Sequence, residues 1–316
     1  AYDQGRGRWP TMSVEERIRC VEDFVFRMKE KRTEVVRLLM WEIGKSLTDS
    51  EKEFDRTVDY VRDTIDALKE IDRQGSRFSA TQGVIAQIRR APLGVALCMG
   101  PFNYPLNETF TTLIPALIMG NTVVFKPAKV GVLLHRPLLE AWRDAFPPGV
   151  VNTVYGDGRT IITPLMTSGK IDVLAFIGSS RVATALEKLH PRPNRLRCIL
   201  GLEAKTPAIV LPDADLDLAV KECLLGSLSY NGQRCTALKM LWLHETIAEA
   251  FLKKFCDGLG ALKCGMPWEP GVHLTPLAEP GKPAYFAEMV AECLNHGARV
   301  VNEGGGTIRA SFFYPA

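Results

Sequence analysis

Short apolar segments alternate with helix-length segments from Gly94 onward, and this alternation is the feature that most constrains the fold. Four segments have the length and apolar content of buried strands: residues 95–99, 122–125, 150–154 and 173–177. Buried parallel strands read as continuous apolar runs, and strands separated by helices indicate a parallel sheet covered by helices. We therefore expect an α/β protein built on a Rossmann-like, nucleotide-binding platform.

The segments on either side of this platform have different patterns. Ser13 and Glu16 have the spacing of a helix capping box, and residues 75–92 predict an extended hairpin between Gly75 and Pro92. A further helix is predicted by an apolar stripe of Phe54, Val58, Val61, Ile65 and Leu68. After the platform we expect a last strand at 208–211 and helices at 216–230, about 245–259 and about 283–297.

Composition excludes several classes of protein. A net charge of +3, from 39 basic and 36 acidic residues, is too small and too dispersed to predict a nucleic-acid partner. No run of about 18 apolar residues and no signal-like segment occurs, so neither a membrane span nor secretion is expected. The eight cysteines form no CxxC pair and the five histidines are scattered, which predicts no metal site and a reducing, cytoplasmic compartment.

One cysteine stands in a sequence context that favours reactivity. Gly232-Gln233-Arg234-Cys235 follows the predicted helix at 216–230. A thiolate is the form that attacks carbonyl groups, and a neighbouring cation such as Arg234 would lower the thiol pKa. Free cysteines are often inert and buried, so this segment alone leaves both interpretations open.

Two motifs upstream of Cys235 favour the interpretation of this cysteine as reactive. Pro101-Phe102-Asn103-Tyr104-Pro105 and Ile177-Gly178-Ser179-Ser180 precede Gly-Gln-Arg-Cys-Thr in an order and spacing that resembles the aldehyde dehydrogenase superfamily. The combination is most similar to its NADP-dependent, non-phosphorylating glyceraldehyde-3-phosphate dehydrogenase branch. The resemblance implies a NAD(P)-binding domain at 1–200, interrupted by an oligomerisation hairpin at about 75–92. It also implies a catalytic domain at 201–316, truncated at its C-terminus, and a homotetramer or homodimer.

The resemblance also implies a cofactor site. Its residues would be Lys126, Pro127, Lys129, Gly158, Gly178, Ser179 and Val182. Gly178 and Ser179 would open a helix whose N-terminus holds the pyrophosphate, although an ordinary turn would have the same sequence. Lys129 stands where NAD-preferring members carry a glutamate, so we expect NADP to be preferred, with NAD possible. The alternative is that Lys129 is a solvated surface charge.

In the family mechanism the Cys235 thiolate would attack an aldehyde. The oxyanion would be held by the Asn103 amide and the Cys235 backbone N–H, although Asn103 is also a typical turn residue. The family's general base falls at Gly201, and a glutamate appears two residues later at Glu203. Alternate residues of an extended segment face the same side, so Glu203 is the candidate base, with a salt bridge to Lys205 as the alternative.

Tyr104, Arg234 and Arg62 are the candidate substrate residues, and glyceraldehyde 3-phosphate is the expected substrate. A small unphosphorylated aldehyde is the alternative. Without an effective base the thioester would await another acceptor, which describes a CoA-acylating (semi)aldehyde dehydrogenase. A catalytically weak dehydrogenase-fold protein that acts by binding is the third hypothesis.

Overall fold

The computed structural model describes every residue from Ala1 to Ala316. The chain divides into two compact units, and each unit is made of two segments. The first comprises Ala1–Leu38 and Glu51–Leu202, and the second comprises Leu39–Ser50 and Glu203–Ala316. The sequence analysis placed one boundary near residue 200 and did not anticipate that a short segment from the helical N-terminal region would join the second unit.

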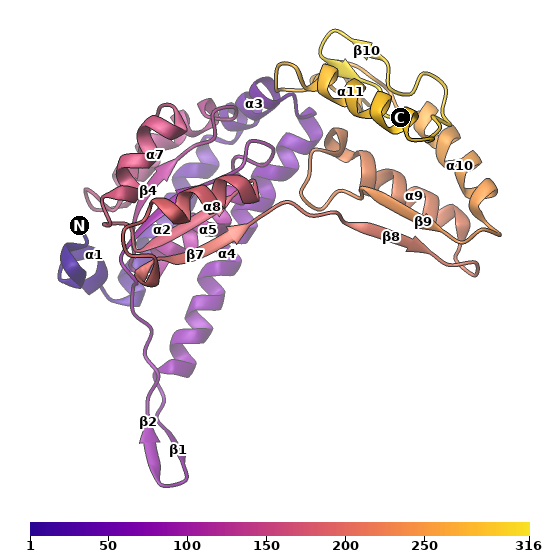
Figure 1. Ribbon diagram of the computed structural model, residues 1–316. Coiled ribbons are helices and arrows are strands. Elements are labelled where there is room, and N and C mark those ends of the chain that lie inside the picture. The colour runs from indigo at the N-terminus through magenta and orange to yellow at the C-terminus, as the bar shows by residue number, and fades with distance from the viewer. The chain divides into compact units, whose positions relative to one another are not determined.

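A five-stranded, fully parallel sheet lies at the centre of the first unit (Figure 1). Its order is β5-β4-β3-β6-β7, with bounds β3 Val95–Met99, β4 Thr122–Lys126, β5 Val151–Thr153, β6 Val173–Ile177 and β7 Arg197–Gly201. The four predicted strands are confirmed. The sequence analysis missed β7, because this edge strand is largely exposed and lacks the continuous apolar run of a buried strand.

Helices cover both faces of this sheet. The helical elements that lie wholly or partly in this unit are η1 Asp3–Gly5, α1 Arg8–Thr11, α2 Val14–Glu30, α3 Arg32–Ile43, α4 Leu47–Gly75, α5 Asn107–Ile118, η2 Leu133–Leu138, α6 Leu139–Ala145, α7 Gly158–Thr167, α8 Ser180–Leu189 and η3 Pro193–Arg195. Leu97 and Leu174 pack in one cluster with Ile162 of α7 and Leu186 of α8. Because side chains alternate along a strand, Cys98 faces the other way, where α5 contacts the sheet.

An aromatic cluster joins α2, α5 and α6. The Phe24 and Trp142 rings stack with their centroids 3.6 Å apart, and Phe110 and Phe146 lie against both. The predicted capping box is confirmed at the start of α2, where Ser13 and the third residue of the helix exchange hydrogen bonds. The predicted stripe of α4 is buried in full. Apolar periodicity therefore identified the helix faces that form this layer.

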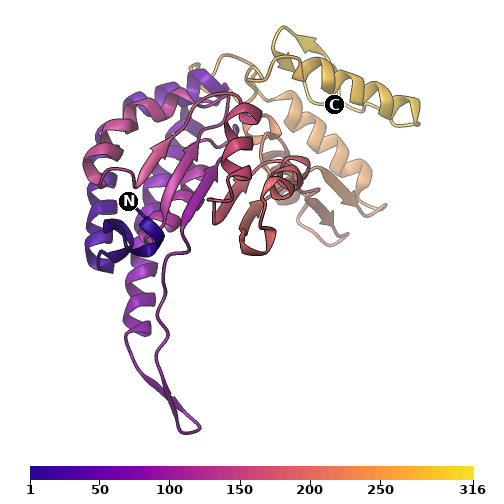
Figure 2. The ribbon, with the colours of Figure 1, turned by 60° about the vertical axis from the view of Figure 1, so that its left-hand side comes forward.

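A two-stranded hairpin extends from the first unit. Its strands, β1 Ser79–Thr81 and β2 Val84–Ala86, are antiparallel, and Gln82 and Gly83 between them both have positive φ, at 52° and 83°. This backbone is typical of a two-residue hairpin turn. Figures 1 and 2 show the hairpin projecting beyond the end of α4, away from the sheet. The predicted hairpin at 75–92 is thus present.

The second unit is built on a smaller sheet. β8 Pro207–Val210 and β9 Met240–Leu243 are parallel, so the strand predicted at 208–211 pairs here and not with the platform. The remaining elements are α9 Leu216–Leu228, η4 Ser229–Gly232, α10 Ala248–Gly260, α11 Lys282–Asn295, β10 Ile308–Arg309 and β11 Phe312–Phe313. Phe251 of α10 and Val220 of α9 form the core below β8. No helix in either unit combines the length and apolarity that crossing a membrane requires.

His135 is a titratable group enclosed in the first unit. It lies in η2, is 1% exposed, and meets the Phe125 ring edge-on at 4.8 Å. Burial lowers the pKa of His135 to about 3, with the Pro105 backbone opposing the shift. The folded protein therefore holds this imidazole neutral over a pH range in which the unfolded chain would protonate it.

We predict that the stability of the first unit depends on pH through this residue. Between pH 6.5 and about 3 the unfolded chain binds a proton that the folded chain does not, so the free energy of unfolding falls as pH falls. The contribution is at most about 1.4 kcal/mol per pH unit. Urea denaturation at several pH values, compared with His135→Leu, measures it. Identical pH dependence in both proteins would contradict this assignment.

Candidate active site

The strand order places a change of direction at the centre of the parallel sheet. β3 lies between β4 and β6, so the chain moves to one edge after β3 and returns to add β6 on the other side. Ligands of open α/β sheets bind outside the carboxyl ends of the strands at such a point. The loop after β3 contains Asn103 and Tyr104, and the turn after β6 contains Gly178 and Ser179. The topology therefore brings two of the sequence motifs to neighbouring strand ends.

The loop that carries Asn103 is anchored by a buried carboxylate. Asn103 and Tyr104 are half-buried in this loop, which leads into α5. Glu53 is 2% exposed and accepts hydrogen bonds from the backbone N–H groups of Leu106 and Asn107, both at 3.1 Å. A carboxylate here satisfies donors that the first turn of α5 leaves unpaired. Nothing in this geometry tests the oxyanion role of Asn103, which stays a prediction.

The turn between β6 and α8 requires a glycine. A Cβ on Gly178 would lie 2.4 Å from the Phe176 ring, and the Gly178 N–H donates to the Gly201 carbonyl of β7 at 3.0 Å. Ser179 is exposed and caps α8, its hydroxyl accepting from the Val182 N–H at 3.4 Å. The exposed start of this ten-residue helix therefore presents backbone donors and the positive end of its dipole.

Lys126, the last residue of β4, lies next to the end of β3 in the sheet. Lys126 pairs with Met99 in the register of β3 and β4, is 8% exposed, and donates to the Pro127 carbonyl at 2.9 Å. Burial lowers the pKa of Lys126, while the nearby Asp157 carboxylate acts in the opposite direction. Lys126 and the buried Pro127 are therefore held at the carboxyl edge, where the sequence analysis expected them.

The other predicted cofactor residues are open to solvent. Lys129 is exposed three residues beyond β4. Gly158 begins α7, and a Cβ added there would meet no atom within 4 Å. Two ammonium groups and an exposed helix N-terminus at one edge of the sheet are a donor set suited to anionic phosphates. The residues therefore fit a dinucleotide, and their individual contacts with one stay predictions.

The backbone before Cys235 adopts a rare conformation. Tyr230, Asn231 and Gly232 are consecutive residues with positive φ, at 52°, 54° and 69°. Residues with side chains seldom adopt this region, so surrounding contacts must hold them there. Asn231 donates to the Thr275 carbonyl and hydroxyl at 3.0 Å each and accepts from the Thr275 N–H at 2.9 Å. At the end of this pinned turn Cys235 is exposed.

The carbonyl group of Cys235 receives two side-chain contacts. Lys239 Nζ donates to it at 3.1 Å and to the Ala237 carbonyl at 2.9 Å, and Thr206 Oγ1 donates to it at 3.4 Å. Sequence reasoning overlooked Lys239, although it is only four residues beyond the cysteine and belongs to the same turn-rich segment. A cation is thus bound to the Cys235 turn by direct hydrogen bonds.

Arg234, the cation that the sequence analysis singled out, is engaged elsewhere. Its guanidinium donates to the Leu225 carbonyl at 3.4 Å and the Gly226 carbonyl at 2.9 Å, near the C-terminus of α9. Both carbonyl groups also accept backbone N–H groups, from Ser229 and Leu238, and a cation near a helix C-terminus interacts favourably with the helix dipole. The contacts show a structural role for Arg234, and its role toward a substrate stays a prediction.

Glu203 lies at the start of the long segment of the second unit. Gly201, two residues earlier, is the last residue of β7, and a Cβ added there would approach the Ile177 side chain at 3.1 Å. Glu203 itself is exposed in an irregular segment, and Thr206, three residues later, reaches the Cys235 carbonyl. The segment that carries the candidate base is therefore tied to the cysteine turn within one unit, while the role of Glu203 stays a prediction.

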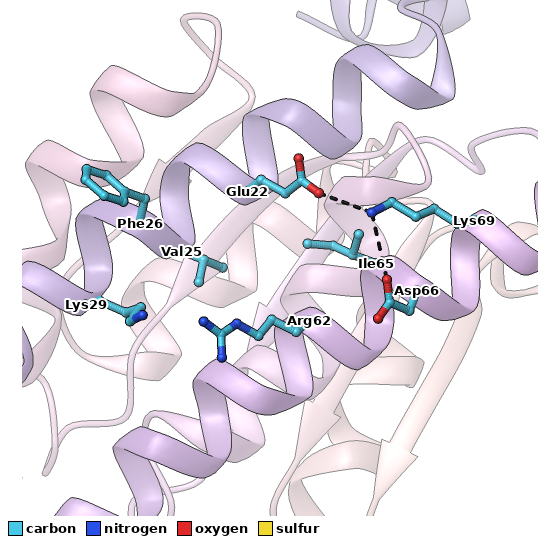
Figure 3. A pocket seen from close by; sticks show the side chains of 8 residues that line it. All are labelled: Glu22, Val25, Phe26, Lys29, Arg62, Ile65, Asp66 and Lys69. Carbon is cyan, nitrogen blue, oxygen red and sulfur yellow. Dashed lines mark hydrogen bonds and ion pairs between the residues drawn. The ribbon is translucent and has the colours of Figure 1, made fainter.

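Arg62 lines a groove between α2 and α4 (Figure 3). The groove has a volume of about 340 Å³, and its walls are Glu22, Val25, Phe26, Lys29, Arg62, Ile65, Asp66 and Lys69. Arg62 lies 3.7 Å from Asp59, and Lys69 bridges the two acidic residues of the wall. No wall residue belongs to the loop of Asn103 and Tyr104, so the substrate role expected for Arg62 gains no support here.

Other cysteines differ from Cys235 in their surroundings. Cys98 is fully buried, and burial raises the pKa of its thiol to about 12. Burial also raises the pKa of the Cys223 thiol in the core of the second unit. A buried thiol with a raised pKa is a poor nucleophile. No group of three or more histidine, cysteine, aspartate or glutamate residues is placed to hold a metal ion.

Known proteins resemble this chain along most of its length. It is 33% identical over 302 residues to an NADP-dependent glyceraldehyde-3-phosphate dehydrogenase of Streptococcus equinus, covering 93% of this chain and 62% of that enzyme. It is 30% identical to the peroxisomal aminoaldehyde dehydrogenase 2 of Pisum sativum, covering 94% of this chain and 59% of the relative. The chain therefore spans about three fifths of the length of these curated relatives.

Solved structures also show similarity to dehydrogenases of this kind. The NADP-dependent glyceraldehyde-3-phosphate dehydrogenase of Bacillus halodurans C-125, complexed with NADP, superposes with a TM-score of 0.88 at 31% identity, covering 97% of this chain and 64% of that one. The protein thus has the aldehyde dehydrogenase fold. The sequence model of the aldehyde dehydrogenase family matches residues 1–316. The chain belongs to the aldehyde dehydrogenase family.

Proposed function

We propose that this protein oxidises an aldehyde to the carboxylic acid with NADP, through a covalent thioester on Cys235. The observation that carries the proposal is the placement of Cys235: its side chain is exposed at the end of a turn whose backbone is held by several hydrogen bonds. A nucleophile needs both access and a fixed position. Membership of the aldehyde dehydrogenase family supports the choice of reaction.

We assign residues of this chain to thiol addition, to stabilisation of the oxyanion and to hydrolysis of the thioester. The Cys235 thiolate adds to the aldehyde carbon, and the oxygen becomes an oxyanion that the Cys235 N–H stabilises. The Asn103 amide is proposed as the second donor because the resemblance to the family implies it. NADP, when bound, supplies the acceptor for the hydride that leaves this carbon. Glu203 then takes a proton from the water that cleaves the thioester, which releases the acid and the free thiol.

The cofactor preference follows from charge. Lys126 and Lys129 at the end of β4 and the exposed N-terminus of α8 would hold the phosphates, with Gly158 and Val182 beside them. An exposed ammonium at position 129 attracts a 2′-phosphate, whereas a glutamate there would repel it. Two relatives whose names include NADP dependence support this choice.

Glyceraldehyde 3-phosphate is the proposed substrate. The same two relatives are glyceraldehyde-3-phosphate dehydrogenases, and Tyr104 is half-buried beside Asn103. Gly201 in place of the family's general base favours a second candidate, a CoA-acylating enzyme in which coenzyme A instead of water accepts the acyl group. The proposed partner in assembly is a second copy of the chain, since the hairpin exposes Phe78, Val84, Ile85 and Ile88.

Stopped-flow absorbance with NADP and glyceraldehyde 3-phosphate tests the function. We expect sustained formation of NADPH without coenzyme A and no NADPH from Cys235→Ser, because serine is a far weaker nucleophile at neutral pH. A single burst that resumes when coenzyme A is added would identify the acylating enzyme. Full activity in Cys235→Ser would remove the thiol from the mechanism.

Glu203→Gln tests the general base. The variant keeps the shape of the side chain and cannot accept a proton, so acylation should proceed and hydrolysis should stall. We expect a burst of NADPH with steady-state turnover reduced about 100-fold. Glu245 is an exposed glutamate two residues beyond β9, and Glu245→Gln is the matched control. Unchanged steady-state turnover in Glu203→Gln would exclude Glu203 as the base.

Lys129→Glu tests the cofactor preference. The charge reversal should lower the ratio of kcat/KM with NADP to kcat/KM with NAD by about tenfold or more, because it replaces attraction of the 2′-phosphate with repulsion. Lys170→Glu reverses another exposed lysine of the same unit and should leave the ratio unaltered. Equal ratios in wild type and Lys129→Glu would contradict the proposal that Lys129 attracts the 2′-phosphate of NADP.

A further inference from the structure

Lys45 is a lysine enclosed in the second unit. It lies in the connection between α3 and α4, and its side chain is 0% exposed. Taking an ammonium group out of water is unfavourable unless other groups compensate its charge. Its Nζ atom stands 4.4 Å above the centroid of the Tyr230 ring, a cation–π contact that is strongest where water is excluded. The buried charge is therefore directed at the first residue of the left-handed turn before Cys235.

The connection around Lys45 contacts the same turn through its backbone. The Tyr230 hydroxyl donates to the Ile43 carbonyl at 3.0 Å, so this side chain is held at its tip and over its ring face. Gly44 adopts φ +65°, and an added Cβ would lie 2.5 Å from the Pro276 carbonyl oxygen. The connection is thus packed tightly against the segment that follows Thr275.

A closed set of contacts results. The connection holds Tyr230, Tyr230 is followed directly by Asn231, and Asn231 is bound by three hydrogen bonds to Thr275. Residues 43–47 are fixed on their other side too, because the Leu47 N–H donates to the Pro267 carbonyl at 2.9 Å. Contacts from both sides hold Tyr230 and Asn231 in a conformation that such residues seldom adopt.

We infer that Lys45 is a positioning residue for the Cys235 nucleophile. Its buried ammonium holds the Tyr230 ring, and through it the left-handed turn that aims Cys235. This inference rests on the proposed role of Cys235. The turn is short, since the Gln233 N–H returns to the Tyr230 carbonyl at 2.9 Å and Cys235 follows two residues later. A displaced Tyr230 would therefore displace the thiol, and small displacements of a nucleophile have large effects on rate.

The test compares three variants in the full chain. Lys45→Met keeps the length of the side chain and removes the charge, whereas Lys45→Arg keeps a cation. Tyr230→Phe keeps the ring and removes the hydroxyl that donates to the Ile43 carbonyl. Lys253→Met removes an exposed lysine from α10 of the same unit and is the matched control. Hydrogen exchange of residues 229–237 and 248–260, followed by mass spectrometry, is measured together with kcat and KM.

We expect amide exchange in residues 229–237 to be about tenfold faster in Lys45→Met, with residues 248–260 unchanged. The kcat for aldehyde oxidation should fall about 10- to 100-fold while KM stays within about twofold, because binding residues are untouched. Lys45→Arg should recover most of the lost kcat. Tyr230→Phe should show about fivefold faster exchange in the same segment.

Other results would contradict the inference that Lys45 positions Cys235. Wild-type exchange at 229–237 in both Lys45→Met and Tyr230→Phe would overturn the inference, and so would equal acceleration in residues 248–260, since that indicates a general loss of stability. If Lys45→Met does not fold, Tyr230→Phe and Lys45→Arg decide by the same exchange measurement. If the wild-type protein oxidises no aldehyde, the proposed function fails, and the exchange comparison alone still decides whether Lys45 holds the turn.

Discussion

Parallel pairing of β3 with both β4 and β6 is the constraint on which the first unit depends. Because the two neighbours lie on opposite sides of β3, the loops that follow β3 and β6 emerge next to each other at the carboxyl edge. The motifs that contain Asn103 and Gly178 are separated by 75 residues in the chain, and only this strand order brings them to neighbouring strand ends. The positions of Lys126 and of the α8 N-terminus follow from the same register.

Buried polar groups fix the loops around this framework. Glu53 holds the start of α5 by two backbone hydrogen bonds, and Lys45 lies over Tyr230 in the second unit. Each group is enclosed at a cost in desolvation, which is offset only when its partners are correctly placed. Both residues follow or belong to the α3–α4 connection and stand within eight positions of each other. This short stretch therefore helps to order one candidate loop in each unit.

Sequence reasoning recovered most of the fold, whereas its assignments of roles to residues of the candidate site stay predictions. Apolar runs predicted β3, β4 and β6, because these strands are largely buried on both faces. The edge strand β5 is only partly buried, and the apolar residues Val150, Val151 and Val154 predicted it. The same reasoning missed β7, whose residues Arg197, Cys198 and Ile199 are exposed. The strand expected after the platform at 208–211 is present as β8. The guanidinium of Arg234 binds carbonyl groups of α9, and its substrate role stays a prediction, whereas no sequence pattern indicated that Lys239 would bind the Cys235 carbonyl. The spacing of residues along a loop does not predict the direction in which their side chains point.

The sequence by itself determined the family, the α/β class and the identity of the candidate nucleophile, because these depend on local periodicity and on motifs whose order along the chain is sufficient. Tertiary structure alone decided which strands are neighbours, that Leu39–Ser50 belongs with the second unit, and that a lysine from that segment supports the turn before Cys235. These facts depend on contacts between residues nearly 190 positions apart, such as Ile43 and Tyr230. Local sequence patterns do not predict such contacts, since they form only when the whole core is packed.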